Sequence, residues 1–176
     1  VVLSHKHIIA RIQTRDMDLY ELPEMGTSLM VVPNYHSAGI QQILKNVHRP
    51  MALVIMRQFE VAAFLSTVTR ERVQSCTLIP TMIKRIIDFP DLHRYNLSSL
   101  IQLRYVSAPM PPDLLRKAMA ALPGCSFTQG YGMTEGSATT LSVEDHTLED
   151  KHAQDYEKKL RRLRSVGRAI KNVEIK

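Results

Sequence analysis

Apolar residues in this chain gather in short segments, and between these segments they recur at intervals of three or four positions. The short segments are typical of buried β-strands, which need only about four to eight such residues. They occupy residues 1–3, 29–32, 51–56, 75–79 and 103–107, and residues 138–143 could form one more.

The spacing of three and four positions predicts an amphipathic helix after each of the first five segments. Ser4 and Thr81 are placed to cap two of these helices, because a hydroxyl can accept a hydrogen bond from the first turn. The residues expected on the buried faces are Ile8, Ile9 and Ile12; Ile40, Ile43, Leu44 and Val47; Val61, Phe64, Leu65 and Val68; Met82, Ile83, Ile86 and Ile87; and Leu114, Leu115, Ala118, Met119 and Leu122.

Strands that read as apolar on both faces and alternate with helices predict an α/β fold, a mostly parallel sheet with helices on both sides. In such a sheet, ligands bind beyond the carboxyl ends of the strands. The loops after Val32, Ile79, Ser107 and Gln129 should therefore lie near one another. These loops hold every candidate functional residue.

The composition fits one soluble domain. Of the 176 residues, 44% are hydrophobic and 23% are charged, which is ordinary for a globular protein. The longest uninterrupted apolar run, residues 51–56, is far shorter than the roughly 20 residues of a membrane-spanning helix, and no signal peptide is visible. Cys76 and Cys125 each lie near the start of a predicted strand, so we expect two reduced, buried thiols in a cytoplasmic protein.

The positive charge is mostly local. The formal net charge is +6, and residues 151–164 alone carry six basic and two acidic side chains. Tyr156, Leu160 and Leu163 form a thin apolar stripe through this segment. We interpret it as a solvated helix, because no aromatic residues are interleaved with the charges as a nucleic-acid platform would require. A salt-sensitive nucleic-acid patch or a membrane patch is the less favoured alternative.

Residues 126–137 concentrate the residue types that bind nucleotides. Three glycines, Gly130, Gly132 and Gly136, enclose Tyr131, Thr134 and Glu135. Their spacing matches neither the dinucleotide fingerprint nor a P-loop. Glycine lets a backbone approach a ligand closely, a tyrosine can stack on a base, and a hydroxyl and a carboxylate can face phosphate and metal. From this segment alone, an ordinary glycine-rich turn between strands is an equal alternative.

A resemblance to a known family rests on seven blocks of the sequence, one of which lies within this segment. They stand at residues 1–5, 32–39 with an aromatic-His-x-x-Gly pattern, 71–82, 95–100, 106–111, 129–135 and 165–175. In this order they resemble the adenylate-forming superfamily of acyl-CoA synthetases and firefly luciferase, which activate carboxylic acids as acyl-AMP. The clearest agreement is between residues 130–135 and the family's Gly-Tyr-Gly-x-Thr-Glu signature.

The resemblance implies a nucleotide site with two walls. Adenine would lie between one wall of Ser107, Ala108 and Pro109 and another of Gln129, Gly130 and Tyr131, with Gly132, Met133 and Thr134 continuing the nucleotide-binding stretch. This sequence departs from the family at one place, because Val106-Ser107 lacks the glycine that is usual there.

The resemblance also implies the catalytic and substrate-binding residues. Thr134 would contact phosphate, and Glu135 would hold the Mg²⁺ that bridges ATP oxygens. His36, together with Gly130, would lie at the acyl pocket and orient the acid near the reaction centre.

From the resemblance we expect residues 1–176 to be a partial AMP-binding domain. The phosphate-binding loop would precede Val1, and the C-terminal domain with its catalytic lysine would follow Lys176. The parent protein would use ATP and Mg²⁺ to convert a fatty or aromatic acid into acyl-AMP and then transfer the acyl group to CoA. The fragment alone would be inactive.

Other functions stay open at this point. The chain could be a non-catalytic nucleotide-binding or interaction module that keeps only the adenine side of the site. Amino-acid adenylation and a luciferase-like oxidation are further possibilities. The sequence also leaves the identity of the acid and the oligomeric state open.

Overall fold

The computed structural model describes residues 2–16, 26–48, 51–142, 146, 156–170 and 173–175. In chain order, its elements are α1 (His5–Asp16), β1 (Thr27–Met30), α2 (Ser37–His48), β2 (Ala52–Ile55), α3 (Val61–Arg70), β3 (Ser75–Leu78), α4 (Pro80–Ile87), η1 (Leu92–Arg94), β4 (Gln102–Val106), α5 (Pro112–Ala121), β5 (Ser126–Met133), β6 (Gly136–Leu141), α6 (Tyr156–Leu163) and β7 (Arg168–Ala169).

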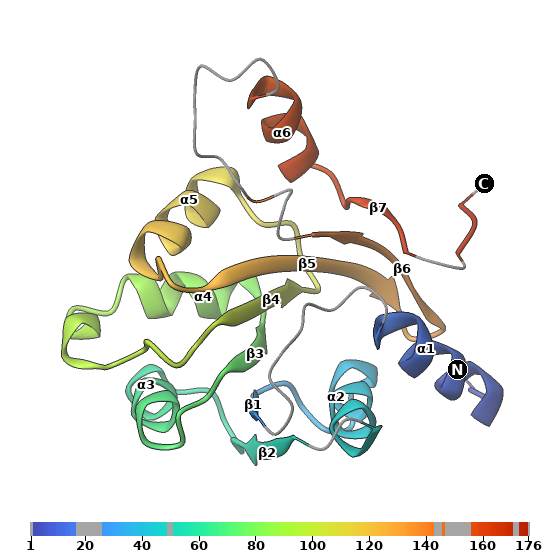
Figure 1. The fold of residues 1–176 in the computed structure, drawn as a ribbon, viewed down its shortest axis with the longest axis horizontal. Coiled ribbons are helices and arrows are strands. Elements are labelled where there is room, and N and C mark those ends of the chain that lie inside the picture. Colours follow the sequence, from blue (N-terminus) through green and yellow to red (C-terminus); the bar gives the residue numbers. More distant parts are fainter. Residues whose placement is uncertain are drawn as a thin grey trace.

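The described strands form one sheet in the order β2-β1-β3-β4-β5-β6-β7. The first five strands of the chain pair in parallel, whereas β6 and β7 are antiparallel to their neighbours. Helices α1 and α2 lie on one side of the sheet, and α3, α4 and α5 lie on the other (Figure 1). The predicted α/β fold, a mostly parallel sheet with helices on both sides, is therefore confirmed.

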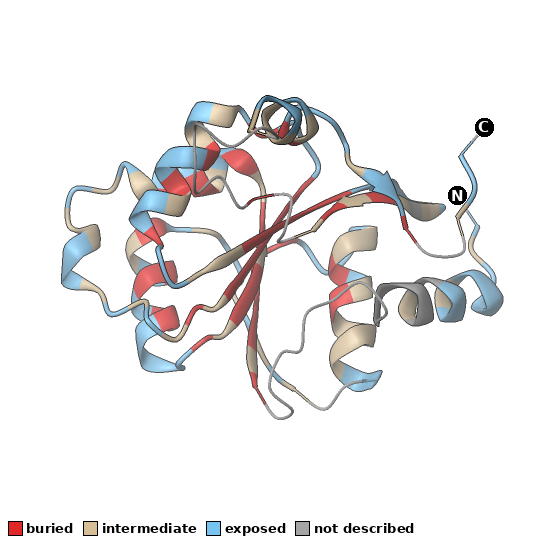
Figure 2. Cartoon of the chain, turned by 45° about the horizontal axis from the view of Figure 1, so that its top comes forward, coloured by how far each residue is buried: buried red, intermediate tan, exposed pale blue. Residues whose placement is uncertain are grey.

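The two faces of the sheet differ, which corrects the expectation that the strands are apolar on both sides. One face presents Leu29, Leu78, Leu103, Tyr105 and Phe127 to α3, α4 and α5, and together they form the buried core (Figure 2). Alternate residues point to the opposite face. There the strands present mostly polar side chains, Ser28, Ser75, Thr77, Gln102, Arg104 and Thr128, together with the apolar Met30 and Val106.

Helix α2 covers the polar face, and its buried side is not the predicted one. Gly39 and Gln42 are buried, whereas Ile40 and Val47 are 44% and 77% exposed. The amide Nε2 of Gln42 donates hydrogen bonds to Ser28 Oγ at 3.0 Å and to the Leu29 carbonyl at 3.1 Å. A polar residue therefore faces the sheet, because the sheet itself is polar at this place.

The other predicted helices are largely confirmed. The expected residues of α3 are all buried, and Ile83, Ile86, Leu115 and Ala118 are the buried centres of α4 and α5. Thr81 does not cap α4, because that helix begins at Pro80 and has Ile79 as its N-cap without a side-chain hydrogen bond.

The N-terminal segment differs from its prediction. Residues 2–3 are not in a strand, and Val2 is 97% exposed. Ser4 does cap α1, since its Oγ accepts a hydrogen bond from the His7 amide at 3.4 Å. Of the expected buried face, Ile9 is 53% exposed, while Ile8 and Ile12 are half-buried.

The apolar run at residues 51–56 gives the edge strand β2 instead of a fully buried one, and Ile55 is 59% exposed. The predicted strands at residues 29–32, 75–79, 103–107 and 138–143 are confirmed with ends shifted by one or two residues. Of the charged segment at residues 144–164, the structure describes α6, with Leu163 buried and Lys158 and Arg161 exposed. His146 and Arg164 are also described, whereas residues 144–145 and 147–155 lie outside the described residues.

Both cysteines are free thiols, as expected. Burial raises the pKa of Cys125 to about 12 and that of Cys76 well above its ordinary value, so neither is a reactive thiolate at neutral pH. Among the helices that the structure describes, none combines the length and apolar character needed to cross a membrane.

A pH-dependent contribution to stability is expected from Glu60, the N-cap of α3. Its carboxylate accepts hydrogen bonds from the amides of Ala63 and Ala62 at 2.8 and 3.2 Å, which lower its pKa below the ordinary value of 4.5. The resulting stabilisation is fully present above pH 4.5 and is lost as the pH falls through the lower folded-state value.

Glu60→Gln should therefore lower the urea midpoint at neutral pH, and its difference from the wild type should shrink below pH 4.5. Glu71→Gln, whose exposed carboxylate pairs with Arg70, is the control and should have a smaller effect. A Glu60→Gln difference that is constant across this pH range would contradict the cap.

A second prediction concerns Gly39 in the first turn of α2. A Cβ at this position would lie 2.2 Å from the Pro33 carbonyl oxygen and 2.9 Å from Asn34 Cα, and these backbone atoms cannot swing away. Gly39→Ala should destabilise the protein by about 2–3 kcal/mol, measured by urea unfolding. Gly124→Ala is the matched control, because nothing lies within 4 Å of its Cβ. Equal stability of the two variants would refute the close contact.

Candidate functional site

The glycine-rich segment is the end of a β-hairpin. Strand β5 carries residues 126–133, Thr134 and Glu135 form the turn, and β6 begins at Gly136. The register shifts between Tyr131 and Gly132, which is the mark of a β-bulge and strengthens the local twist. The segment is thus a turn between strands, and its residues also face a cavity.

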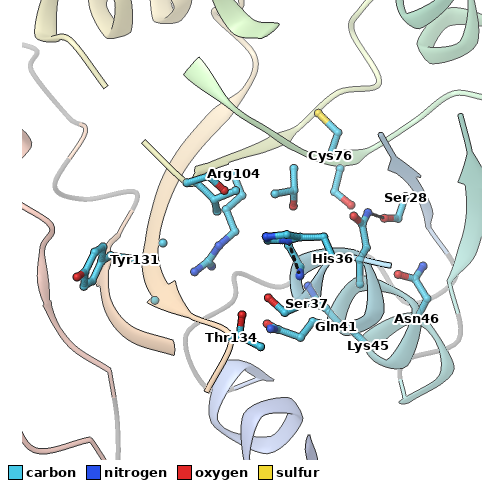
Figure 3. A pocket seen from close by; sticks show the side chains of 18 of the residues that line it. Ser28, His36, Ser37, Gln41, Lys45, Asn46, Cys76, Arg104, Tyr131 and Thr134 are labelled. Atoms are coloured by element: carbon cyan, nitrogen blue, oxygen red, sulfur yellow. Dashed lines mark hydrogen bonds between the residues drawn. The ribbon is translucent and has the colours of Figure 1, made fainter. Parts of the chain in front are cut away.

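The cavity has a volume of about 460 Å³ and lies between α2 and the polar face of the sheet. The hairpin end closes one side of it, and Figure 3 shows side chains from both walls pointing inward. Of the residues predicted to form the site, those that line it are His36, Ser107, Gly130, Tyr131, Gly132, Met133, Thr134 and Glu135. The loops after β1, β4 and β5 therefore meet, as predicted from the strand order.

Three predicted residues do not line the cavity. Ala108 and Pro109 are exposed in the loop after β4, and Gln129 is buried in β5. Gln129 pairs with Tyr105, which belongs to the apolar face. Ile79, whose loop was expected nearby, also does not line the cavity, although Thr77 of the same strand does.

The hairpin end has two chemically different sides. Successive residues of a strand point to opposite faces, so Gly130 faces the cavity while the side chains of Gln129 and Tyr131 point away from it. Figure 3 shows the Tyr131 ring on the far side of β5 from His36 and Arg104, and this ring is 47% exposed. The hairpin therefore separates the cavity from a second surface that carries an exposed aromatic ring.

His36 stands just before α2, and a backbone hydrogen bond indicates the tautomer of its neutral ring. The Ala38 amide donates a hydrogen bond to His36 Nδ1 at 3.2 Å. Since Nδ1 acts as the acceptor, the proton of the neutral imidazole must sit on Nε2. The ring lies inside the cavity between the helix and the sheet (Figure 3), so Nε2 can donate a hydrogen bond to a bound molecule.

Sequence reasoning missed several cavity residues, of which Arg104 is the most informative. It lies in the middle of β4, and only 9% of it is exposed. A Cβ added to Gly130 would come within 2.1 Å of its Nη2 atom, so the side chain lies directly on the backbone of β5. An arginine inside a predicted buried strand is itself unusual, and this signal could have identified it. The polar lining also includes Ser28, Gln41, Gln42, Lys45, Asn46, Ser75, Thr77 and Gln102.

Within the described residues, no three histidine, cysteine, aspartate or glutamate side chains come together to hold a metal ion. Glu135 is exposed at the hairpin turn beside Thr134. A single exposed carboxylate suits Mg²⁺, which usually keeps several waters and is shared with substrate phosphates. The site therefore fits a metal that arrives with a nucleotide better than a resident metal centre.

Comparison with known proteins places this geometry in a family. The sequence model described as AMP-binding enzyme matches residues 1–176. The chain is similar to 4-coumarate–CoA ligase 3 of Arabidopsis thaliana, with 34% identity over 149 residues, or 81% of this chain and 26% of that protein. It is also similar to acyl-CoA synthetase 7 of Caenorhabditis elegans, with 30% identity over 61% of this chain and 20% of that protein. The chain thus spans about a quarter of the length of the curated relatives it matches.

Solved structures agree on the fold. The N-terminal domain of FACL13 from Mycobacterium tuberculosis superposes with a TM-score of 0.82 at 22% identity, over 97% of this chain and 40% of that domain. The o-succinylbenzoate coenzyme A synthetase of Bacillus subtilis, solved in complex with ATP and magnesium ion, gives a TM-score of 0.78 at 22% identity, over 98% of this chain and 33% of that protein. At this identity the likeness establishes a shared fold.

The backbone of Ser107 gives a testable consequence. Its φ of 72° lies in the left-handed region, where a residue with a Cβ is strained and glycine is not. Ser107→Gly should stabilise the folded state by about 0.5–1 kcal/mol, because relief of this strain outweighs the added freedom of the unfolded chain. Urea unfolding measures the change. Ser98→Gly in the loop before β4 is a comparison at a position without a positive φ, and it should not stabilise.

Proposed function

This chain belongs to the AMP-binding enzyme family, and we propose that the complete protein activates a carboxylic acid with ATP and transfers the acyl group to CoA. In the first step a carboxylate oxygen attacks the α-phosphorus of ATP, and pyrophosphate leaves. In the second, the CoA thiolate attacks the acyl carbon and AMP leaves. The observation that carries the proposal is the end of the hairpin, residues 130–135. One of its sides can bind ATP and the other can bind the acid, so that only the backbone of β5 lies between the two reactants.

The nucleotide is proposed to lie on the Tyr131 side of the hairpin. The exposed Tyr131 ring can stack on adenine, and the exposed residues Ser107, Ala108 and Pro109 can form the facing wall. Gln129 stands on the same side of β5. Gly132 and Met133 lead from this side to the turn, where the Thr134 hydroxyl can donate a hydrogen bond to a phosphate oxygen.

The acid is proposed to lie on the opposite side, in the cavity between α2 and the sheet. Gly130 separates the two sides with the thickness of a single backbone. The reacting carboxylate would therefore approach the α-phosphate past this residue. His36 supports that position, because its Nε2 proton can hold a carboxylate oxygen in place.

Glu135 is proposed to hold Mg²⁺ at the hairpin turn, together with the phosphates of ATP. When bound, Mg²⁺ neutralises phosphate charge in the transition state. Glu135 contributes the anionic oxygen that fixes the phosphate chain relative to Thr134, and thereby positions the leaving pyrophosphate.

The class of acid and the cellular setting belong to the same proposal. A fatty or an aromatic acid is expected, since relatives include both acyl-CoA and 4-coumarate–CoA ligases. Two free thiols, Cys76 and Cys125, support a cytoplasmic protein. The alternative of a non-catalytic nucleotide-binding module is not favoured, because the relatives named above are ligases and synthetases.

Exchange of labelled pyrophosphate into ATP, dependent on an added acid, tests the proposal in the complete protein. Glu135→Ala should reduce this exchange by about 100-fold or more, because an electrostatic contact to the transition state is lost. Glu157→Ala, on the exposed side of α6, is the control and should leave exchange unchanged. If Glu135→Ala behaves like the wild type, or if no acid supports exchange, the proposed function is wrong.

A further inference from the structure

The inner part of the cavity is polar, although it was expected to hold a fatty or aromatic acid. Register pairs the Cα atoms of Ser28 with Ser75, and of Ser75 with Gln102, so these three side chains form a row across β1, β3 and β4. A second row, one pleat nearer the hairpin, contains Thr77 and Arg104. Gly130, in the row after that, faces the mouth. All of these residues line the cavity.

Two amide groups in this inner part lack hydrogen-bond partners among the described residues. Gln102 is 5% exposed and its Nε2 donor is unpaired, while Gln42 is 9% exposed and its Oε1 acceptor is unpaired. The orientation of Gln42 is set by its Nε2, which donates to the Leu29 carbonyl. Leaving such groups buried without partners costs about 1–3 kcal/mol each. A plain hydrocarbon tail placed here would leave the Gln102 donor unsatisfied, whereas an anionic oxygen can accept a hydrogen bond from it.

The charged side chains of the inner cavity are basic. Arg104 from the sheet and Lys45 from α2 both line it, whereas Glu135, the one carboxylate among the described residues of the lining, is exposed at the hairpin turn. Arg104 and Lys45 also interact with other groups of the protein. A guanidinium has five N–H donors and an ammonium has three, so each can accept a ligand in addition to a protein partner.

Building on the proposed function, we infer that the acid carries a second carboxylate at its far end, held by Lys45 and the Nε2 of Gln102. The Arg104 guanidinium lies beside Gly130, at the reacting end. The class of substrate is thus a dicarboxylic acid with an aliphatic or aromatic middle. One carboxylate reacts beside Gly130 and His36. The other replaces its hydration shell with cationic and amide donors, and charge-assisted hydrogen bonds of this kind are the stronger ones.

The dimensions of the cavity agree with a ligand of this length. From Gln102 to Val106, whose Cα pairs with that of Gly130, the strand rises by about 13 Å at 3.3 Å per residue. The volume of about 460 Å³ has room for a small acid. A dicarboxylate can therefore reach from the hairpin to the inner row, and each end would meet polar partners.

A matched panel of octanedioate, octanoate and ω-hydroxyoctanoate tests the inference in the complete protein, with acid-dependent pyrophosphate exchange as the readout. We expect kcat/KM for octanedioate to exceed that for octanoate by about 100-fold or more, because only octanedioate brings an anionic oxygen to Lys45 and to the Gln102 donor. A preference for octanoate, or equal use of ω-hydroxyoctanoate and octanedioate, would overturn the second carboxylate. Absence of exchange with every acid, aromatic acids included, would instead overturn the proposed function itself.

A variant tests one of the residues responsible. Lys45→Met keeps a long side chain without charge, and it should lower the ratio of octanedioate to octanoate kcat/KM by about tenfold or more. Lys117→Met, on the exposed side of α5, is the control and should leave the ratio unchanged. Lys45 is half-exposed, so this variant should fold like the wild type. Calorimetry of octanedioate binding should show the same loss in Lys45→Met, and an unchanged ratio and affinity in that variant would refute its role.

Discussion

The difference between the two faces of the sheet is the constraint on which the rest of the structure depends. Parallel strands send alternate side chains to opposite sides, and here one set is apolar and the other polar. The apolar set, with Leu103, Tyr105 and Phe127, is buried against three helices and forms the core. The polar set cannot be covered by an apolar helix without losing its hydrogen bonds. Helix α2 therefore meets it with Gln42, and a cavity lies between them.

The hairpin end joins the two faces at a single point. Its antiparallel partner β6 holds the end of β5 beyond the parallel sheet, so residues 131–135 project where the neighbouring strand β4 has already ended. Alternation along β5 then gives the cavity a residue without a side chain, Gly130, and gives the other face the Tyr131 ring. One short segment can in this way contribute to two binding surfaces that are chemically unlike.

The sequence predicted the fold class well, because apolar segments and helical spacing depend mainly on local burial. It predicted less where tertiary context decides. The run at residues 51–56 reads the same for an inner strand and for the edge strand β2. The inward face of α2 was wrong because Gln42 looks like a surface residue until its partners Ser28 and Leu29 are known. The glycine motif located the hairpin residues of the cavity. The inner wall of the cavity depends on the register between strands that are far apart in sequence, and no local pattern reveals this register.

The contact between Gly130 and Arg104 ties two positions together across neighbouring strands. A methyl group at position 130 would meet the Arg104 guanidinium, so a larger residue is tolerated there only if the side chain at position 104 is short or turns elsewhere. The two positions should therefore covary among relatives. A long cationic side chain at position 104 requires glycine at position 130, and a shorter residue at position 104 removes this requirement. Evolution of the cavity toward a different ligand would then proceed in an order, with the residue on β4 changing before the one on β5.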